Sequence, residues 1–267
     1  MHRRTLLTAA SYATACSALA PLGSAHAQVT DLNDAINKAG RQRMLSQRVG
    51  KAWLALAHKA DTPTARQVMQ QSIALFERQL VELKAYAPSP TIRETYTKLE
   101  TAWAAHKAAL AADTSLADNA SALLQADAKV LALAHLGTTQ YEAASGKPVG
   151  QLVNIAGRQR MLSQRMAKFY LAAMLPVDAA AATAEIAKAR AEFVAATELL
   201  RNAPQATSRI RQELQLADSQ WVFFDAALQR MQGGGNVNRQ VAEVYVASEN
   251  LLVSMDRVTG MYAALAA

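Results

Sequence analysis

The chain contains the decapeptide Ala-Gly-Arg-Gln-Arg-Met-Leu-Ser-Gln-Arg twice, at Ala39–Arg48 and again at Ala156–Arg165. Ten consecutive identities exclude chance, so the chain contains an internal duplication and both halves should fold alike. Other matched residues keep the same order in the two halves. They pair Phe76 with Phe193, Ala87 and Pro88 with Ala203 and Pro204, Trp103 with Trp221, and Tyr141 with Tyr262.

The composition favours helices in both halves. Glycine (11), proline (7) and aromatic residues (6%) are sparse, whereas alanine, leucine, glutamine, arginine and lysine are common. Breaks rich in Pro, Gly and Asp divide each half into four segments of helical length. The first predicted helix starts at a cap formed by Asp31 or Asn33 and ends near residue 59. The others cover residues 64–86, 91–112, 117–144, 150–175, 178–202, 205–232 and 236–264.

Four helices joined by short connections form an up-and-down bundle. The predicted fold is therefore all-α, with two tandem antiparallel four-helix bundles related by internal duplication. Ser145-Gly146-Lys147-Pro148 is the best linker in the chain. It divides the protein into a first domain, 28–145, and a second domain, 146–267.

Residues 1–27 are predicted to be a signal peptide. A charged start that includes Arg3 and Arg4 precedes a weakly apolar middle, and Ala25-His26-Ala27 resembles a cleavage site. The general secretory route and the twin-arginine route both remain open. The only cysteine, Cys16, would leave with this segment, and no later stretch approaches the roughly 18 apolar residues of a membrane span. We expect a soluble periplasmic protein.

The polar residues exclude several function classes. The only histidines after residue 27 are His58, His106 and His135, none of which is matched in the second half. The sequence has no metal-ligand spacing, nucleophile elbow or phosphate loop, so we expect neither an enzyme nor a metal site, and we predict no cofactor. The net charge of +7 suits an anionic ligand or simply a basic surface. Since the basic residues are interleaved with acids in an exported chain, we expect no nucleic-acid binding.

Helical spacing divides the decapeptide helix into three faces. The first face is the predicted bundle core. It holds Ala35, Ala39, Gln42, Leu45, Val49, Ala52 and Leu56, with Leu152, Ala156, Gln159, Leu162, Met166, Phe169 and Ala173 in the second copy. The second face is basic, and we expect it to be solvated or salt-bridged. It holds Asn37, Arg41, Met44, Arg48 and Lys51, with Asn154, Arg158, Met161, Arg165 and Lys168 in the second copy.

The third face has small residues near an arginine and a glutamine. It reads Ile36, Gly40, Arg43, Gln47, Gly50 and Leu54, with Val153, Gly157, Arg160, Gln164, Ala167 and Leu171 in the second copy. A glycine inside a helix costs about 1 kcal/mol relative to alanine, so Gly40 and Gly157 predict the close passage of another helix. A buried arginine needs an acceptor or a counter-charge. This face therefore predicts either a bound anion or a carboxylate from a neighbouring helix that pairs with Arg43.

The decapeptide resembles the signature of the PilJ-type sensor domain, which is found at the N-terminus of type IV pilus chemotaxis transducers. It is also similar to the Gly-x-x-Arg-Met-x-Ser-x-Arg box of nitrate and nitrite sensor kinases of the NarX/NarQ type. The resemblance implies four-helix bundles in which one arginine from each of two subunits clasps a nitrate. By motif position those arginines are Arg43 and Arg160, and the family glycine matches Gly40 and Gly157.

Departures from the nitrate-sensor pattern leave the ligand open. Those sensors have a tyrosine where this chain has Gln47 and Gln164, and we expect neither the second membrane helix nor the transmitter of such receptors. We predict an exported sensor in which Arg43 and Arg160 of a pseudo-dimer within one chain bind a small anion such as nitrate or nitrite. The wider set of predicted ligand-binding residues adds Gly40, Gly157, Gln47, Gln164, Asn37 and Asn154.

Two further hypotheses concern assembly and partners. A homodimer could build each site from two copies of one repeat. The sensor would pass its signal to a membrane-bound receptor, kinase or transporter. The alternative function is a helical interaction module that docks on such a partner without any ligand.

Overall fold

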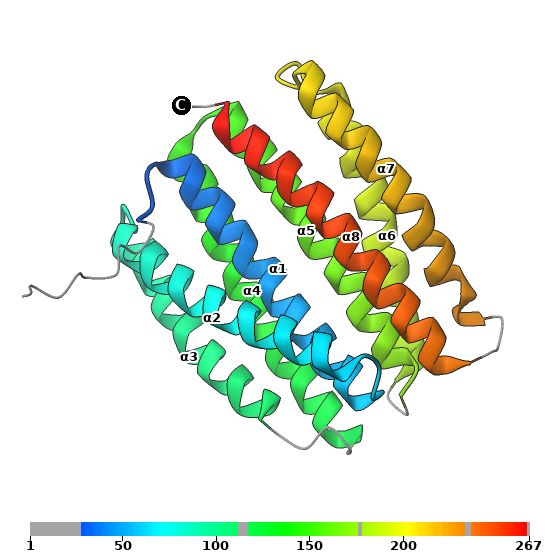
Figure 1. The fold of residues 1–267 in the computed structure, drawn as a ribbon. Coiled ribbons are helices and arrows are strands. Elements are labelled where there is room, and N and C mark those ends of the chain that lie inside the picture. Colours follow the sequence, from blue (N-terminus) through cyan, green and yellow to red (C-terminus); the bar gives the residue numbers. More distant parts are fainter. Residues whose placement is uncertain (1–27, 112–116, 176–177, 233–235, 266–267) are drawn as a thin grey trace, which may run out of the picture.

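The computed structural model describes residues 28–111, 117–175, 178–232 and 236–265. Within these ranges the chain is helical and contains no strand, which confirms the predicted all-α class (Figure 1). The first repeat forms α1 (Leu32–Ala57), α2 (Thr62–Tyr86), α3 (Pro90–Leu110) and α4 (Ala117–Ser145). The second repeat forms α5 (Pro148–Ala173), α6 (Ala179–Asn202), α7 (Ser208–Gln229) and α8 (Val237–Ala264).

The helix boundaries lie close to the predicted ones because capping residues set them. Asp31 caps α1, where its carboxylate accepts hydrogen bonds from the backbone N–H groups of Asn33 and Asp34. The largest difference is at α7, which begins at Ser208 instead of residue 205. The side chain of Thr207 accepts a hydrogen bond from Ile210 N and fixes this start. A 3₁₀ turn, Arg230–Gln232, follows the end of α7.

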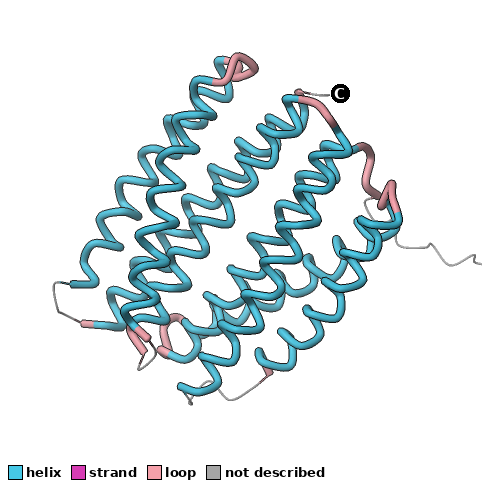
Figure 2. The backbone as a smooth tube through the Cα atoms, turned by 180° about the vertical axis from the view of Figure 1, so that it is seen from behind, coloured by secondary structure: helices cyan, strands magenta, loops and turns pink. Residues whose placement is uncertain are grey.

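Each repeat is a four-helix unit, and the two units pack along their first helices. In the first repeat α1 packs on α2 and α4, and α3 packs on α4; α5 to α8 repeat this pattern. The most extensive contact between helices joins α1 to α5. As a result α1, α4, α5 and α8 form the centre of the molecule, with α2 and α3 on one flank and α6 and α7 on the other (Figures 1 and 2).

Matched side chains make the same contacts in both repeats. Phe76 stacks on Trp103 with ring centroids 3.7 Å apart, and Phe193 stacks on Trp221 at 4.5 Å. The tyrosine hydroxyl near the end of each last helix donates to a carbonyl oxygen of the second helix. Tyr141 donates to Leu83 O and Tyr262 donates to Leu200 O, both at 2.6 Å. The duplication read from the sequence is therefore a duplication of three-dimensional structure.

Helices α1 and α5 run in the same direction and pass close to each other at their glycines. A Cβ atom placed on Gly40 would lie 3.7 Å from Gly157 Cα, and one placed on Gly157 would lie 3.7 Å from Gly40 Cα. Further along, a Cβ on Gly50 would lie 3.1 Å from Lys168 Cδ, which fixes the parallel direction. The predicted close passage of another helix at Gly40 and Gly157 is confirmed.

Two predictions about the ends and divisions of the chain stand apart from the helices. The expected signal peptide, 1–27, lies outside the described residues. The predicted domains, 28–145 and 146–267, divide at the junction between α4 and α5, and this division stays a prediction. None of the described helices has both the length and the apolar character needed to cross a membrane.

We predict that Gly40→Val destabilises the protein by about 1–3 kcal/mol, because the added methyl groups would overpack the crossing. The nearest atom, Arg43 Nη2, already lies 3.3 Å from a Cβ at this position. Gly260→Ala in α8 is the control, since no atom lies within 4 Å of its added Cβ. This change should leave stability equal or raise it slightly. Urea denaturation followed by circular dichroism measures both, and a Gly40→Val protein as stable as the wild type would contradict the tight crossing.

Candidate functional site

Arg43 and Arg160 meet where α1 crosses α5. Both side chains are fully buried, with 0% of each residue exposed. A Cβ atom on Gly40 would lie 3.3 Å from Arg43 Nη2 and 3.5 Å from Arg160 Nη2. The absence of side chains at Gly40 and Gly157 thus provides the space that the two guanidinium groups occupy. The structure brings together these four predicted site residues.

Each arginine reaches across the crossing to the asparagine of the other repeat. Arg43 Nη2 donates to Asn154 O at 3.1 Å and to Asn154 Oδ1 at 2.7 Å. Arg160 Nη2 donates to Asn37 O at 2.9 Å. Asn154 Nδ2 in turn donates to a carboxylate oxygen of Glu142. The predicted site residues Asn37 and Asn154 therefore contact the arginines, mainly through backbone oxygens.

The two arginines differ in their third partner. Arg160 Nη1 donates to Asp256 Oδ1 at 2.5 Å. Arg43 Nη1 lies 3.3 Å from His135 Nδ1. Alignment of α4 with α8 on Tyr141 and Tyr262 places His135 opposite Asp256. A neighbouring carboxylate, considered from the sequence for Arg43, is found for Arg160 instead, while the hydrogen-bond acceptors of Arg43 are uncharged.

Burial and neighbouring positive charges make the crossing electrostatically expensive. Burial, followed by the charges of Arg158 and Arg160, lowers the pKa of Arg43 to about 9. Burial and the charge of Arg41 lower the pKa of Arg160 to about 10, although Asp256 opposes the shift. Both groups stay protonated at neutral pH. Their Nε atoms have no hydrogen-bond partner. The crossing thus holds two buried positive charges and one directly bonded carboxylate.

The predicted glutamines point away from the arginines. Gln47 Nε2 donates to both carboxylate oxygens of Asp127 at 2.9 Å, and Gln164 Nε2 donates to Ser248 O at 2.9 Å. Each glutamine therefore fixes its own motif helix to the last helix of its repeat. Their predicted role in ligand binding stays a prediction.

A family model described as "Type IV pili methyl-accepting chemotaxis transducer N-term", PilJ, matches the chain twice, at residues 25–131 and 141–246. The chain belongs to the PilJ family. Each match covers most of one repeat, so the protein is a tandem of two PilJ domains. The family is one of sensor and transducer domains, which gives the chain a general role in chemosensory signalling. Comparison with curated proteins and with solved structures gave no match.

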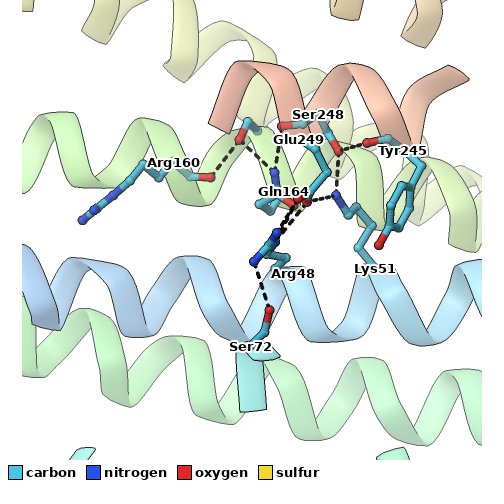
Figure 3. A network of polar contacts seen from close by, with 9 residues as sticks. Arg48, Lys51, Ser72, Arg160, Gln164, Tyr245, Ser248 and Glu249 are labelled. Atoms are coloured by element: carbon cyan, nitrogen blue, oxygen red, sulfur yellow. Dashed lines mark hydrogen bonds and ion pairs between the residues drawn. The ribbon is translucent and has the colours of Figure 1, made fainter. Parts of the chain in front are cut away.

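The sequence predicts that the basic face of the motif helix is either solvated or salt-bridged. In the structure this face is salt-bridged, but its lysines are not at the surface. Lys51 is fully buried and Lys168 is 1% exposed. Lys51 Nζ donates to Ser248 Oγ at 2.7 Å and to Glu249 Oε1 at 2.6 Å, and Arg48 shares Glu249 (Figure 3). Helix α8 of the second repeat covers this part of α1, which the sequence of one helix alone cannot reveal.

Lys168 has the corresponding place in the second PilJ domain but pairs with a different acid. Its Nζ donates to Asp127, a fully buried carboxylate of α4 in the first domain. By the same alignment of α4 with α8, Asp127 corresponds to Ser248, and Ala128 corresponds to Glu249. Each repeat therefore supplies an acid to the buried lysine of the other repeat, from adjacent positions on equivalent helices.

Burial and these ion pairs act in opposite directions on the pKa values of the paired groups. Burial would raise the pKa of Glu249, but the charge of Lys51 and the hydrogen bonds and charge of Arg48 outweigh it and lower the value to about 2. Burial lowers the pKa of Lys51 to about 8, against the attraction of Glu249. Burial also lowers the pKa of His106, which lies 3.9 Å from Asp127, to about 4.

The important residues that sequence reasoning missed are Asp127, His135, Glu249 and Asp256. All four lie on α4 or α8, outside the decapeptide. The sequence does contain a sign of them. When α4 and α8 are aligned on their matched tyrosines, Asp127, Glu249 and Asp256 each face a residue that is not an acid in the other repeat. Among the described residues, no group of three His, Cys, Asp or Glu could hold a metal ion.

The different positions of Asp127 on α4 and Glu249 on α8 allow a test of whether the two repeats are structurally equivalent. Asp127→Ser should destabilise the protein by about 3–5 kcal/mol, because it leaves buried Lys168 without a counter-charge. Adding Ala128→Glu should restore most of this loss, since the pair then copies Ser248 and Glu249 of the second repeat. Urea denaturation gives the free energies of unfolding. A double variant no more stable than Asp127→Ser would show that the repeats are not equivalent here.

Proposed function

We propose that the protein is an exported PilJ sensor that binds a small oxyanion, such as nitrate or nitrite, at the crossing of α1 and α5. Arg43 and Arg160 would hold the ligand, and Gly40 and Gly157 leave room for their two guanidinium groups. A membrane-bound receptor, kinase or transporter would detect the change that the bound ligand causes in the contact between the two repeats. Export rests on the expected signal peptide, and the family name links such domains to chemotaxis transducers.

The observation that carries the proposal is the excess of buried positive charge at the crossing. Of the two fully buried guanidinium groups only that of Arg160 is bonded to a carboxylate, that of Asp256, and the Nε atoms of both arginines lack partners. A Cβ atom on Gly40 would lie 3.3 Å from Arg43 Nη2 and 3.5 Å from Arg160 Nη2, so the two positive charges are close together. Like charges that are close repel strongly where the dielectric constant is low. A planar oxyanion would accept charge-assisted hydrogen bonds from both arginines and offset that repulsion.

Ligand binding would then act on the contact between the two repeats. Helices α1 and α5 come from different PilJ domains and form the main contact between them. An anion that binds both arginines favours the conformations in which this crossing is tight. The shift in population would change the relative position of the outer helix pairs α2–α3 and α6–α7, which a partner could detect.

Isothermal titration calorimetry with nitrate and with nitrite tests the site. We expect binding by the wild type and a loss of roughly a hundredfold or more in the double variant Arg43→Gln with Arg160→Gln, which removes several charge-assisted hydrogen bonds. Arg239→Gln is the control for general charge effects, because Arg239 is an exposed residue of α8. Circular dichroism checks that each variant is folded. Unchanged binding by the folded double variant would refute the arginine site.

A second function, the ligand-independent interaction module, is favoured by apolar residues on the surface of the second repeat. Phe223 of α7 is 69% exposed and Val246 of α8 is 55% exposed, and both line the same surface hollow. The equivalent positions in the first repeat are Ala105 and Gln125. Capture of a membrane receptor that survives the double arginine change but is lost in Phe223→Ser with Val246→Ser would support this module over the anion sensor.

A further inference from the structure

The duplication creates two equivalent grooves beside the motif helices. One lies over α5 between α4 and α6 and encloses a cavity of about 260 Å³. The other lies over α1 between α8 and α2. The floor of each is built from matched residues of the decapeptide. They are Arg158, Met161, Leu162 and Arg165 in the α5 groove and Arg41, Met44, Leu45 and Arg48 in the α1 groove.

In the α1 groove the acids of α8 neutralise the floor. Arg41 Nη2 lies 3.0 Å from Asp256 Oδ1, and Arg48 Nη2 lies 2.5 Å from Glu249 Oε2. The same Asp256 bonds Arg160 and so covers that arginine from this side. Arg160 does not line the α1 groove. Asp256 thus takes the place beside Arg160 that an anion would occupy. The lining of the α1 groove as a whole is still basic, with Lys38, Arg41, Arg48, Arg78 and Arg257 against Glu82 and Asp256, so what distinguishes the two grooves is the carboxylate bonded to the central arginine.

In the α5 groove the wall formed by α4 lacks those acids. The residues of α4 that correspond to Asp256 and Glu249 are His135 and Ala128. Acids come instead from α6 on the opposite wall, where Glu192 pairs with Arg158 and Glu185 pairs with Arg165. The cavity is therefore asymmetric in charge, with carboxylates on the α6 side and none among the α4 residues that line it.

Two positive charges of this cavity are in excess of its carboxylates. Its charged lining consists of Arg43, Arg158, Arg165, Lys188, Glu185 and Glu192. Arg43 is fully buried, makes its hydrogen bonds only to uncharged acceptors and has an Nε atom without a partner. A buried charge without a counter-ion is strongly destabilising, so an anion that enters beside Arg43 gains a large favourable interaction.

His135 adds a hydrogen-bond donor to the same wall. Arginine has donors only, so the contact of Arg43 Nη1 with His135 Nδ1 requires that this nitrogen accept. The proton of the neutral imidazole is then on Nε2. Burial and the charges of Arg43 and Arg158 lower the pKa of His135, which keeps it neutral at neutral pH. The ring can therefore donate from Nε2 to an oxygen atom in the groove.

We propose that the α5 groove binds a small organic carboxylate. The carboxylate group would lie against Arg43 and His135, and its hydrocarbon part would contact the apolar lining formed by Leu131, Met161 and Leu162. The volume supports an organic ligand, because about 260 Å³ is several times the roughly 30 Å³ share of one water molecule in the liquid. The excess of two positive charges favours a dicarboxylate, with Lys188 facing the second carboxylate.

This inference goes beyond the proposed oxyanion site, although the two sites share Arg43. The oxyanion would lie between Arg43 and Arg160, whereas the carboxylate would bind on the side of Arg43 that faces α4. Arg160 has no part in the α5 groove. The two proposals can therefore fail separately.

The deciding experiment gives the α5 groove the carboxylate that the second repeat already has. In His135→Asp the new side chain should pair with Arg43 as Asp256 pairs with Arg160. Calorimetry with succinate, with butyrate as a monocarboxylate for comparison, should show binding to the wild type and at least about a tenfold weaker affinity in His135→Asp. The same variant should unfold a few degrees higher, so weaker binding could not be attributed to misfolding.

Arg160→Gln separates this groove from the oxyanion site. It should weaken binding of nitrate while succinate affinity stays within about twofold of the wild type, and circular dichroism confirms the fold. Equal succinate affinity in His135→Asp and wild type would overturn the proposal. Absence of succinate and butyrate binding to the wild type would overturn it as well, whatever the result with nitrate.

Discussion

The close parallel crossing of α1 and α5 is the constraint on which the rest of the molecule depends. Gly40 and Gly157 bring the helix backbones into contact, and the two arginines fill the space beside them. Because both arginine side chains are fully buried, their hydrogen-bond partners have to be supplied by the protein or by a ligand. Helices α4 and α8 supply two of these partners, His135 for Arg43 and Asp256 for Arg160.

The two most deeply buried lysines of the motif helices, Lys51 and Lys168, are neutralised across the boundary between repeats. Lys51 of the first repeat relies on Glu249 of the second, and Lys168 of the second relies on Asp127 of the first. Each of these lysines contacts a helix of the other repeat that also supplies its acid, and a lysine that stayed buried without its acid would cost several kcal/mol. The repeats are thus held together by reciprocal ion pairs as well as by apolar packing, and each contributes to the stability of the other.

The sequence predicts the fold well because the relevant signals are local. Helical composition, caps such as Asp31 and the breaks at proline fix the helices, and the repeated decapeptide fixes the duplication. The glycine and arginine of its third face also predict the crossing. What it does not predict is which helix covers Lys51, or that Asp256 and His135 take equivalent places. Those facts depend on packing between segments far apart in the chain, and the acids differ between repeats, so no repeated pattern marks them.

Because two copies are fused into one chain, the two sides of the α1–α5 crossing can differ in sequence. In a dimer of identical subunits every substitution appears twice, so an aspartate beside one arginine implies an aspartate beside the other. Such an assembly can have two carboxylates at its axis or none. Here the copies vary separately, and the axis has Asp256 on one side and His135 on the other. Covalent linkage also makes the pairing independent of protein concentration. The second repeat can therefore keep its arginine, Arg160, permanently paired with Asp256, while Arg43 of the first repeat stays without a bonded carboxylate.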